Sequence, residues 1–126
     1  MKAYIILLLI YGVFEIISNS YHLLKGSRVK IAESAKKQHR EIPFDLEPNK
    51  YYYKAILMFI TGILFTLSSL IYFFYDAKIG LIFSLINSII HSVYGLYQLI
   101  TYRKFNRVWG AFVVYSIPLI LYFIVI

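Results

Sequence analysis

Four long stretches of this chain, over residues 3–24, 53–75, 79–102 and 108–126, carry almost no charged side chains. Each is close to the ~20 residues that a helix needs to cross ~30 Å of hydrocarbon. A soluble domain of 126 residues has no core large enough to bury four such segments. Because a chain inside lipid must satisfy its own backbone hydrogen bonds, each stretch predicts a membrane-spanning helix. The sequence therefore predicts an all-α fold, a four-helix bundle that forms a single transmembrane domain over residues 1–126.

Basic residues are concentrated on alternate connections between these stretches. The links over residues 25–54 and 103–107 hold eleven Lys and Arg, whereas the opposite side holds two, Lys2 and Lys78. Loops rich in Lys and Arg stay in the cytoplasm. We therefore expect the long basic loop over residues 25–52 to be cytoplasmic and both termini to be non-cytoplasmic. The predicted location is the bacterial inner membrane.

The formal net charge is +7, and the chain contains no cysteine. An excess of positive charge often indicates nucleic-acid binding, but here the charges lie at the ends of apolar stretches, so no nucleic-acid partner is expected. The predicted partners are membrane lipids and either other membrane subunits or further copies of the chain. The lack of cysteine excludes disulfides, thiolate metal sites and lipidation at Cys.

The first basic loop has two interpretations. Residues 27–40 form either a basic helix on the membrane surface, or a solvated loop. In the helix, the apolar side chains expected to face inward are Val29, Ile31, Ala32 and Ala35. Anionic headgroups attract clustered Lys and Arg, and the candidate lipid or partner contacts are Lys30, Lys36, Lys37 and Arg40. Two prolines then predict an extended strap over residues 41–48.

Two of the apolar stretches carry a polar stripe. In the first span Glu15, Asn19 and His22 share one helix face, and in the third span the stripe runs through Asn87, His91, Tyr94 and Gln98. Exposing ionisable groups to lipid is costly, so we expect the two stripes to face each other. These seven residues are the candidate intramembrane polar site.

Glu15 and His91 lie at similar depth in parallel spans, each about twelve residues from the outer end and near the midplane. They are the candidate buried pair, either as a proton or cation site or as a polar clasp that fixes helix register. Asn19, Asn87 and Gln98 are expected to act as structural contacts between helices. His22 is expected to be hydrated near the interface.

The sequence predicts no cofactor and no metal. Two axial histidines for haem need equal depth, but His22 and His91 differ by about seven residues, or roughly 10 Å. A zinc site needs three or four ligands, and Glu15 with His91 supplies two. Motifs of hydrolases and phosphate-binding loops are also missing, so the chain is not expected to be an enzyme.

The two halves of the chain have a similar order of features. Gly12 precedes the polar stripe of the first span, and Gly80 precedes that of the third. This order fits a 2+2 hairpin repeat, and chance with shared membrane composition explains it equally well. In the second span Gly62, Thr66 and Ser69 form a small-residue stripe of the kind that lets helices approach closely.

Four short spans and one Glu midway along the first of them resemble the small multidrug resistance transporters. The matching residue is Glu15, in the segment Phe14-Glu15-Ile16. The resemblance implies that this Glu binds protons and cationic drugs in competition, within an antiparallel dimer. The chain departs from that family in its long first loop and its charge bias. Its third span carries Asn87 and His91 where the family has a Gly and Trp pattern.

Three functions fit these observations. The first is a non-enzymatic accessory or structural subunit of a larger membrane complex, indicated by the missing catalytic motifs, the small-residue faces and the many aromatic residues. The alternative is a small proton- or cation-linked transporter, channel or immunity-type protein that uses Glu15 and His91. The third is a lipid-modifying membrane enzyme, indicated by polar stripes that open toward a basic face. Fold alone does not choose among them.

Overall fold

The computed structural model describes residues 1–38, 48–104 and 106–126, and these residues form five helices and no strand. In chain order the helices are α1 (Lys2–Leu23), α2 (Arg28–Gln38), α3 (Pro48–Phe74), α4 (Ala77–Thr101) and α5 (Asn106–Val125). Four of them, all except α2, are long and apolar enough to cross a membrane. The predicted all-helical fold is confirmed, and the four long helices suggest membrane association.

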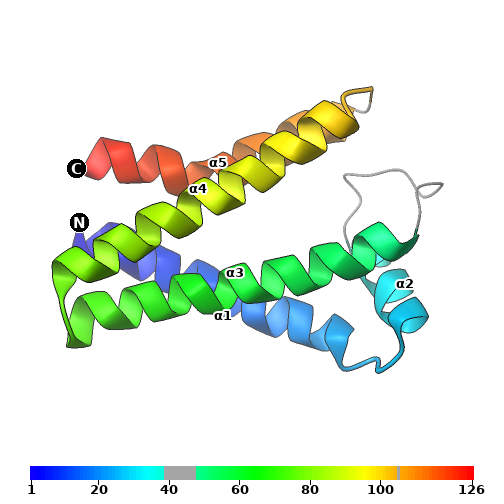
Figure 1. Cartoon of the computed structure of the whole chain (residues 1–126), viewed down its shortest axis with the longest axis horizontal. Helices are drawn as coiled ribbons and strands as arrows, with labels where there is room; N and C mark the ends of the chain where they lie inside the picture. Colours follow the sequence, from blue (N-terminus) through cyan, green and yellow to red (C-terminus); the bar gives the residue numbers. More distant parts are fainter. Residues whose placement is uncertain (39–47, 105) are drawn as a thin grey trace.

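The long helices form a bundle of antiparallel neighbours (Figure 1). α1 packs along α3, α3 along α4 and α4 along α5, whereas α1 meets α5 only briefly and lies diagonally opposite α4. Both chain termini and the α3–α4 turn lie at one end, here called the terminal end. The other end, here called the basic end, holds α2, the first turn of α3, the end of α4 and the start of α5.

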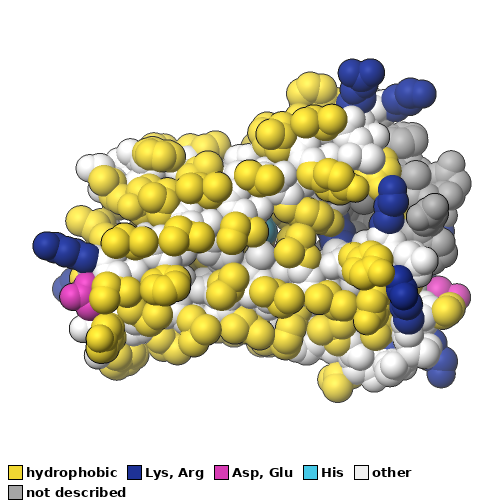
Figure 2. All heavy atoms as spheres, in the orientation of Figure 1, with side chains coloured by type: hydrophobic (Ala, Val, Ile, Leu, Met, Phe, Trp, Pro, Cys, Tyr) yellow, Lys and Arg dark blue, Asp and Glu magenta, His cyan; other side chains and the backbone are white. Residues whose placement is uncertain are grey.

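The outer surface between the two ends is apolar. Figure 2 shows hydrophobic side chains covering the visible face, with most Lys and Arg gathered at the basic end. Large side chains such as Ile17, Ile100 and Phe123 are about two-thirds exposed, at 66%, 66% and 68%. An exposed apolar surface of this extent is unfavourable in water and is suited to contact with lipid.

Two close approaches of helices depend on glycine. At the α1–α3 crossing, a Cβ atom on Gly62 would lie 2.9 Å from both the Gly12 carbonyl oxygen and the Glu15 Cβ. At the terminal end, a Cβ on Gly80 would lie 2.6 Å from backbone atoms of Tyr72, which brings α3 and α4 together next to their turn. The small-residue stripe predicted in the second span is thus a packing surface.

Polar side chains tie the helices together at several levels. Ser69 Oγ donates a hydrogen bond to the Ile5 carbonyl across the α1–α3 contact, at 3.2 Å. Asn87 Nδ2 donates to the Thr61 carbonyl across the α3–α4 contact, at 3.1 Å. Such contacts between helices in lipid typically contribute about 0.6–2 kcal/mol each. The Asp76 side chain caps α4 by accepting from the Ile79 N–H, at 2.9 Å.

Helix α2 packs on the bundle at the basic end. Its Ile31, Ala32 and Ala35 are buried in a cluster with core residues of α3, α4 and α5. The predicted helix is therefore present over residues 28–38 and buries these three side chains. The prediction was wrong for Val29, which is 65% exposed, because the buried face follows the i, i+1, i+4 positions from Ile31.

Helix α3 begins earlier than its apolar stretch indicated. It starts at Pro48, ahead of Tyr53, where the span was predicted to begin. Proline is well tolerated at the first helical position because its missing N–H has no partner there in any case. Tyr51, which precedes the predicted span, is a core residue with 1% exposure. The rest of the predicted strap, residues 41–47, lies outside the described residues.

Candidate functional site

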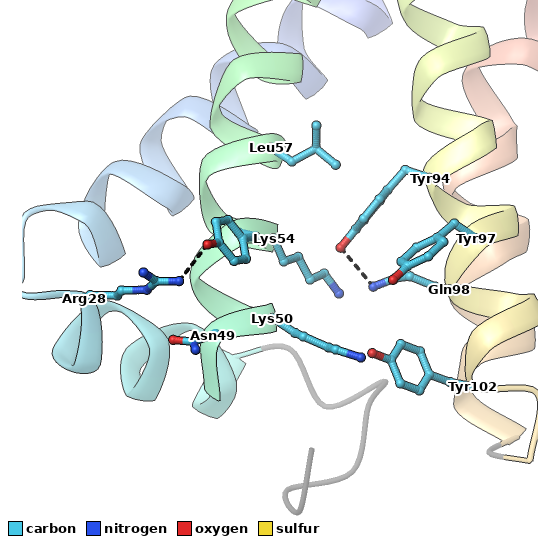
Figure 3. Close-up of a pocket in the computed structure, with 10 residues that line it drawn as sticks. Arg28, Asn49, Lys50, Lys54, Leu57, Tyr94, Tyr97, Gln98 and Tyr102 are labelled. Atoms are coloured by element: carbon cyan, nitrogen blue, oxygen red, sulfur yellow. Dashed lines mark hydrogen bonds between the residues drawn. The ribbon is translucent and has the colours of Figure 1, made fainter. Parts of the chain in front are cut away.

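A cleft of about 550 Å³ opens between α3 and α4 at the basic end (Figure 3). It is lined by Arg28, Asn49, Lys50, Tyr53, Lys54, Leu57, Tyr94, Tyr97, Gln98 and Tyr102. Three of these ten residues are basic, four are tyrosines and none is acidic. The volume lies within the range of about 300–1,000 Å³ that is typical of small-molecule sites.

Helical spacing brings the lining residues together. On α3, Lys50 and Lys54 are four residues apart and therefore lie on one face. On α4, Tyr94, Gln98 and the capping residue Tyr102 repeat the same spacing. Figure 3 shows the two lysine side chains reaching across the cleft toward the α4 residues. The close contact at Gly80 holds the helices together only at the terminal end, so the cleft opens at the basic end.

The basic side chains lie against aromatic rings. Lys50 Nζ lies 5.0 Å from the centre of the Tyr102 ring, and Lys54 Nζ lies 5.7 Å from the centre of the Tyr115 ring. Such cation–π contacts hold each ammonium group beside an aromatic ring at the cleft. At the mouth, Arg28 Nη2 donates to the Tyr53 hydroxyl at 2.7 Å. Lys54 is 1% exposed, which is unusual for a lysine.

Two polar atoms at the cleft have no hydrogen-bond partner among the residues that the structure describes: Gln98 Oε1 and the Tyr102 hydroxyl. Gln98 is 2% exposed and Tyr102 is 6% exposed. The Gln98 amide nitrogen is used, since Nε2 donates to the Tyr94 hydroxyl at 3.1 Å. Leaving a buried polar atom unsatisfied costs about 1–3 kcal/mol, so each such atom needs an explanation. Both residues line the cleft, although the two atoms themselves are covered by protein.

A second polar centre lies deeper in the bundle, around His91, which is fully buried. His91 Nδ1 is 3.0 Å from the Tyr115 carbonyl oxygen on α5, and His91 Nε2 is 3.0 Å from the Tyr11 hydroxyl on α1. Glu15 lies one turn further along α1, on the same face as Tyr11. Asn19 Nδ2 donates to Glu15 Oε2 at 2.8 Å. Of the two predicted stripes, His91 thus contacts Tyr11, and Glu15 contacts Asn19.

The other predicted site residues are divided among separate places. Tyr94 and Gln98 line the cleft, whereas Asn87 ties α4 to α3. His22 was expected to be hydrated, but it is buried and its Nδ1 lies 2.7 Å from Ser34 Oγ of α2. This expectation was wrong because α2 packs over the end of α1.

The basic residues predicted to contact lipid belong to α2. Lys30 and Lys37 are exposed and border a shallow surface pocket of about 260 Å³ together with Lys25 and Glu33. Lys36 is half-buried on the same helix. Arg40 lies outside the described residues.

Sequence reasoning missed the α3 half of the cleft. Lys50 and Lys54 were counted as loop charges, although their spacing of four residues next to three consecutive tyrosines was a visible signal. Tyr102 extends the stripe of Tyr94 and Gln98 by one further turn and could have been found by the same periodicity. Tyr115 gave no such signal, because its role depends on where α5 packs.

Within the described residues, no group of three His, Asp or Glu side chains is placed to hold a metal ion. Comparison with protein-family models, with curated proteins and with solved structures finds no match to this chain. The functional argument therefore depends on the geometry of the cleft and of the polar centre.

Proposed function

We propose that this chain is a non-enzymatic integral membrane protein that binds an anionic lipid headgroup in the cleft between α3 and α4. The observation that carries the proposal is the convergence of Lys50, Lys54 and Arg28 on a space whose ten described lining residues include no acidic one. Basic pockets between membrane helices on the cytoplasmic side are recognised binding places for anionic headgroups. The charge bias of the loops supports an orientation with the basic end toward the cytoplasm of a bacterial inner membrane.

The two atoms without a hydrogen-bond partner indicate which chemical groups the ligand carries. The Tyr102 hydroxyl can donate a hydrogen bond to a phosphate oxygen, whereas Gln98 Oε1 can only accept one. Both atoms are covered by protein in this structure, so they reach a ligand when the side chains around them move. A headgroup that carries both a phosphate and a hydroxyl group would then satisfy both atoms. A glycerol phosphodiester, as in phosphatidylglycerol, has both groups. Its acyl chains would lie along the exposed apolar faces of α3 and α4.

The lining residues favour binding over catalysis. Amines, a guanidinium, phenols and amides surround the cleft, and none of the ten residues is a histidine, the most common general base, or a carboxylate or cysteine. Such groups can bind and orient an anion without a chemical step. The proposal therefore gives no support to a lipid-modifying enzyme.

Native mass spectrometry in micelles tests the proposal. The protein is titrated with phosphatidylglycerol and, separately, with phosphatidylcholine. The double variant Lys50→Gln/Lys54→Gln is expected to weaken phosphatidylglycerol binding at least about tenfold, because each charge-assisted hydrogen bond contributes about 1.5–3 kcal/mol. The matched control, Lys30→Gln/Lys37→Gln, removes two exposed charges of α2 and is expected to bind within about twofold of wild type, since rim charges contribute little. Equal loss in both double variants would overturn the proposal.

A milder variant separates ligand binding from folding. Tyr102→Phe removes a hydroxyl that has no partner in the free protein. Stability is expected to be unchanged or slightly higher, while phosphatidylglycerol affinity falls. Inorganic phosphate is tested as a competitor, because it distinguishes a lipid site from a site for the free anion. If phosphate displaces the lipid completely, the cleft is an anion site and the lipid assignment is wrong.

An accessory role in a larger membrane complex is compatible with lipid binding and is part of the same proposal. An anionic lipid held at a helix surface commonly fills the contact between subunits, and the exposed apolar faces supply the rest of such a contact. The same mass spectra, recorded on protein extracted gently from its own membrane, are expected to contain a partner subunit or a second copy. Detection of a monomer alone would contradict the accessory role and would not affect the proposal of a lipid site.

A further inference from the structure

A surface pocket of about 260 Å³ lies where the end of α1 meets α2, at the basic end of the bundle. It is lined by Tyr21, Lys25, Lys30, Glu33, Ser34 and Lys37, none of which lines the cleft between α3 and α4. On α2, Lys30, Glu33 and Lys37 are spaced by three and four residues, so their side chains share one face. The pocket therefore combines three ammonium groups with one carboxylate, whereas the described lining of the cleft contains no acid.

The exposed face of α1 leads from this pocket toward the middle of the membrane. At 100° per residue, Ile10, Phe14 and Tyr21 lie within about 40° of one another around the helix. Their side chains are 61%, 60% and 61% exposed, respectively. Tyr21 and Ile10 are eleven residues apart, or about 16 Å along the helix. This distance is close to the depth of one leaflet, about half of the ~30 Å of hydrocarbon.

An apolar groove of about 470 Å³ separates α1 from α5 at the inner end of this face. Its walls include Phe14 of α1 and Ile117 and Leu121 of α5. Tyr11 supplies the only polar side-chain group among the residues that line the groove, and its hydroxyl lies 3.0 Å from His91 Nε2 inside the bundle. The groove is therefore suited to a hydrocarbon chain.

We propose that this face of α1 binds one phosphatidylethanolamine molecule. Its headgroup lies in the pocket between α1 and α2, and one acyl chain runs along α1 into the groove beside α5. Lys25, Lys30 and Lys37 surround the phosphate, and Glu33 accepts hydrogen bonds from the primary ammonium group. The charges are complementary, because this headgroup carries one negative and one positive group. The site is separate from the cleft and does not depend on the lipid proposed there.

The chemistry of the pocket favours an ethanolamine headgroup over the other common ones. Choline has no N–H group, and proteins recognise it with the faces of aromatic rings. Tyr21 has the only aromatic ring among the six lining residues, and Lys25 Nζ already lies over it, 4.2 Å from the ring centre. A glycerol headgroup carries no positive charge to pair with Glu33. Ethanolamine supplies both the charge and the N–H donors that a carboxylate accepts.

Photo-crosslinking in micelles tests the position of the acyl chain. The probe is a phosphatidylethanolamine with a diazirine near the end of one acyl chain, and cross-linked residues are identified by mass spectrometry. Cross-links are expected mainly at residues 7–14 of α1 and 114–121 of α5. An excess of unlabelled phosphatidylethanolamine should remove them, whereas the same excess of phosphatidylglycerol or phosphatidylcholine should not. Cross-links spread evenly over all four long helices, or equal competition by all three lipids, would overturn the inference.

Glu33→Gln tests the headgroup by native mass spectrometry. Because Glu33 is exposed, its replacement is expected to leave the fold intact. The affinity for phosphatidylethanolamine is expected to fall about two- to fivefold, the range for an exposed ion pair, while phosphatidylglycerol binding stays within about twofold. Lys50→Gln/Lys54→Gln is the converse control, which should weaken phosphatidylglycerol binding and leave phosphatidylethanolamine binding within about twofold. If Glu33→Gln leaves phosphatidylethanolamine binding unchanged, the present inference is wrong, whatever the result at the cleft.

Discussion

Gly80 allows α3 and α4 to meet at the terminal end, and replacing it with alanine is the most direct test of the bundle geometry. An alanine Cβ would lie 2.6 Å from the N, Cα and Cβ atoms of Tyr72. Ordinary contacts of a Cβ atom begin at 3.4 Å, so the helices must separate by 3.4 − 2.6, or about 0.8 Å. Because the atoms met are mainly backbone, no rotation of a side chain relieves the clash.

Gly110 in α5 is the matched control. A Cβ added there has no neighbour within 4 Å. Both substitutions gain the same helix propensity of about 1 kcal/mol, so that contribution cancels when the two variants are compared. The remaining difference is the overpacking cost, about 1–3 kcal/mol. Gly80→Ala is therefore expected to be less stable than Gly110→Ala by this amount.

Reversible unfolding in mixed micelles, followed by circular dichroism of helix content, measures the difference. Gly80→Ala is expected to unfold at a lower denaturant fraction than Gly110→Ala, and its α3–α4 turn is expected to exchange amide hydrogens faster. If the two variants unfold within about 0.5 kcal/mol of each other, the close contact at Gly80 does not exist as described, and the reason for the cleft opening at the basic end is lost.

Three further outcomes follow from single contacts, and each is measured by the same unfolding experiment. Asp76→Ala removes the cap of α4 and is expected to cost about 0.5–2 kcal/mol, whereas Asp76→Asn retains most of the stability; equal loss in both would contradict the capping role. Ser69→Ala removes the hydrogen bond to the Ile5 carbonyl and is expected to cost about 0.6 kcal/mol; no loss would mean that the bond is not formed in lipid. Tyr53→Phe removes the partner of the exposed Arg28 and is expected to change stability by less than about 0.5 kcal/mol, and a larger change would assign this pair a structural role.

The four long helices could be predicted from the length of the apolar stretches alone, without knowing how the helices pack. The polar stripes were also visible, since helical spacing places Tyr94 and Gln98 on one face. The depth argument placed Glu15 and His91 at the same level. It did not give the rotation of each helix about its axis, which decides that Tyr11 contacts His91.

Other features depend on tertiary packing and had no sequence signal of their own. Lys54 was counted among the basic loop charges because it lay at the very start of the predicted span, whereas α3 begins at Pro48 and so Lys54 lies more than a turn inside the helix and is buried. His22 was predicted to lie at the interface, but α2 packs over it and Ser34 of α2 contacts its ring. For Lys54 the start of the helix was predicted too late, and for His22 the presence of α2 was left undecided. Each error hid the burial of one polar side chain.

Tyr115 connects the cleft with the polar centre around His91. Its ring lies beside Lys54, and its carbonyl oxygen accepts the hydrogen bond from His91 Nδ1. By thermodynamic linkage, an effect of lipid binding on the contact at His91 is matched by an equal effect of that contact on lipid binding. A substitution at His91 should therefore alter the affinity for phosphatidylglycerol, although His91 does not line the cleft.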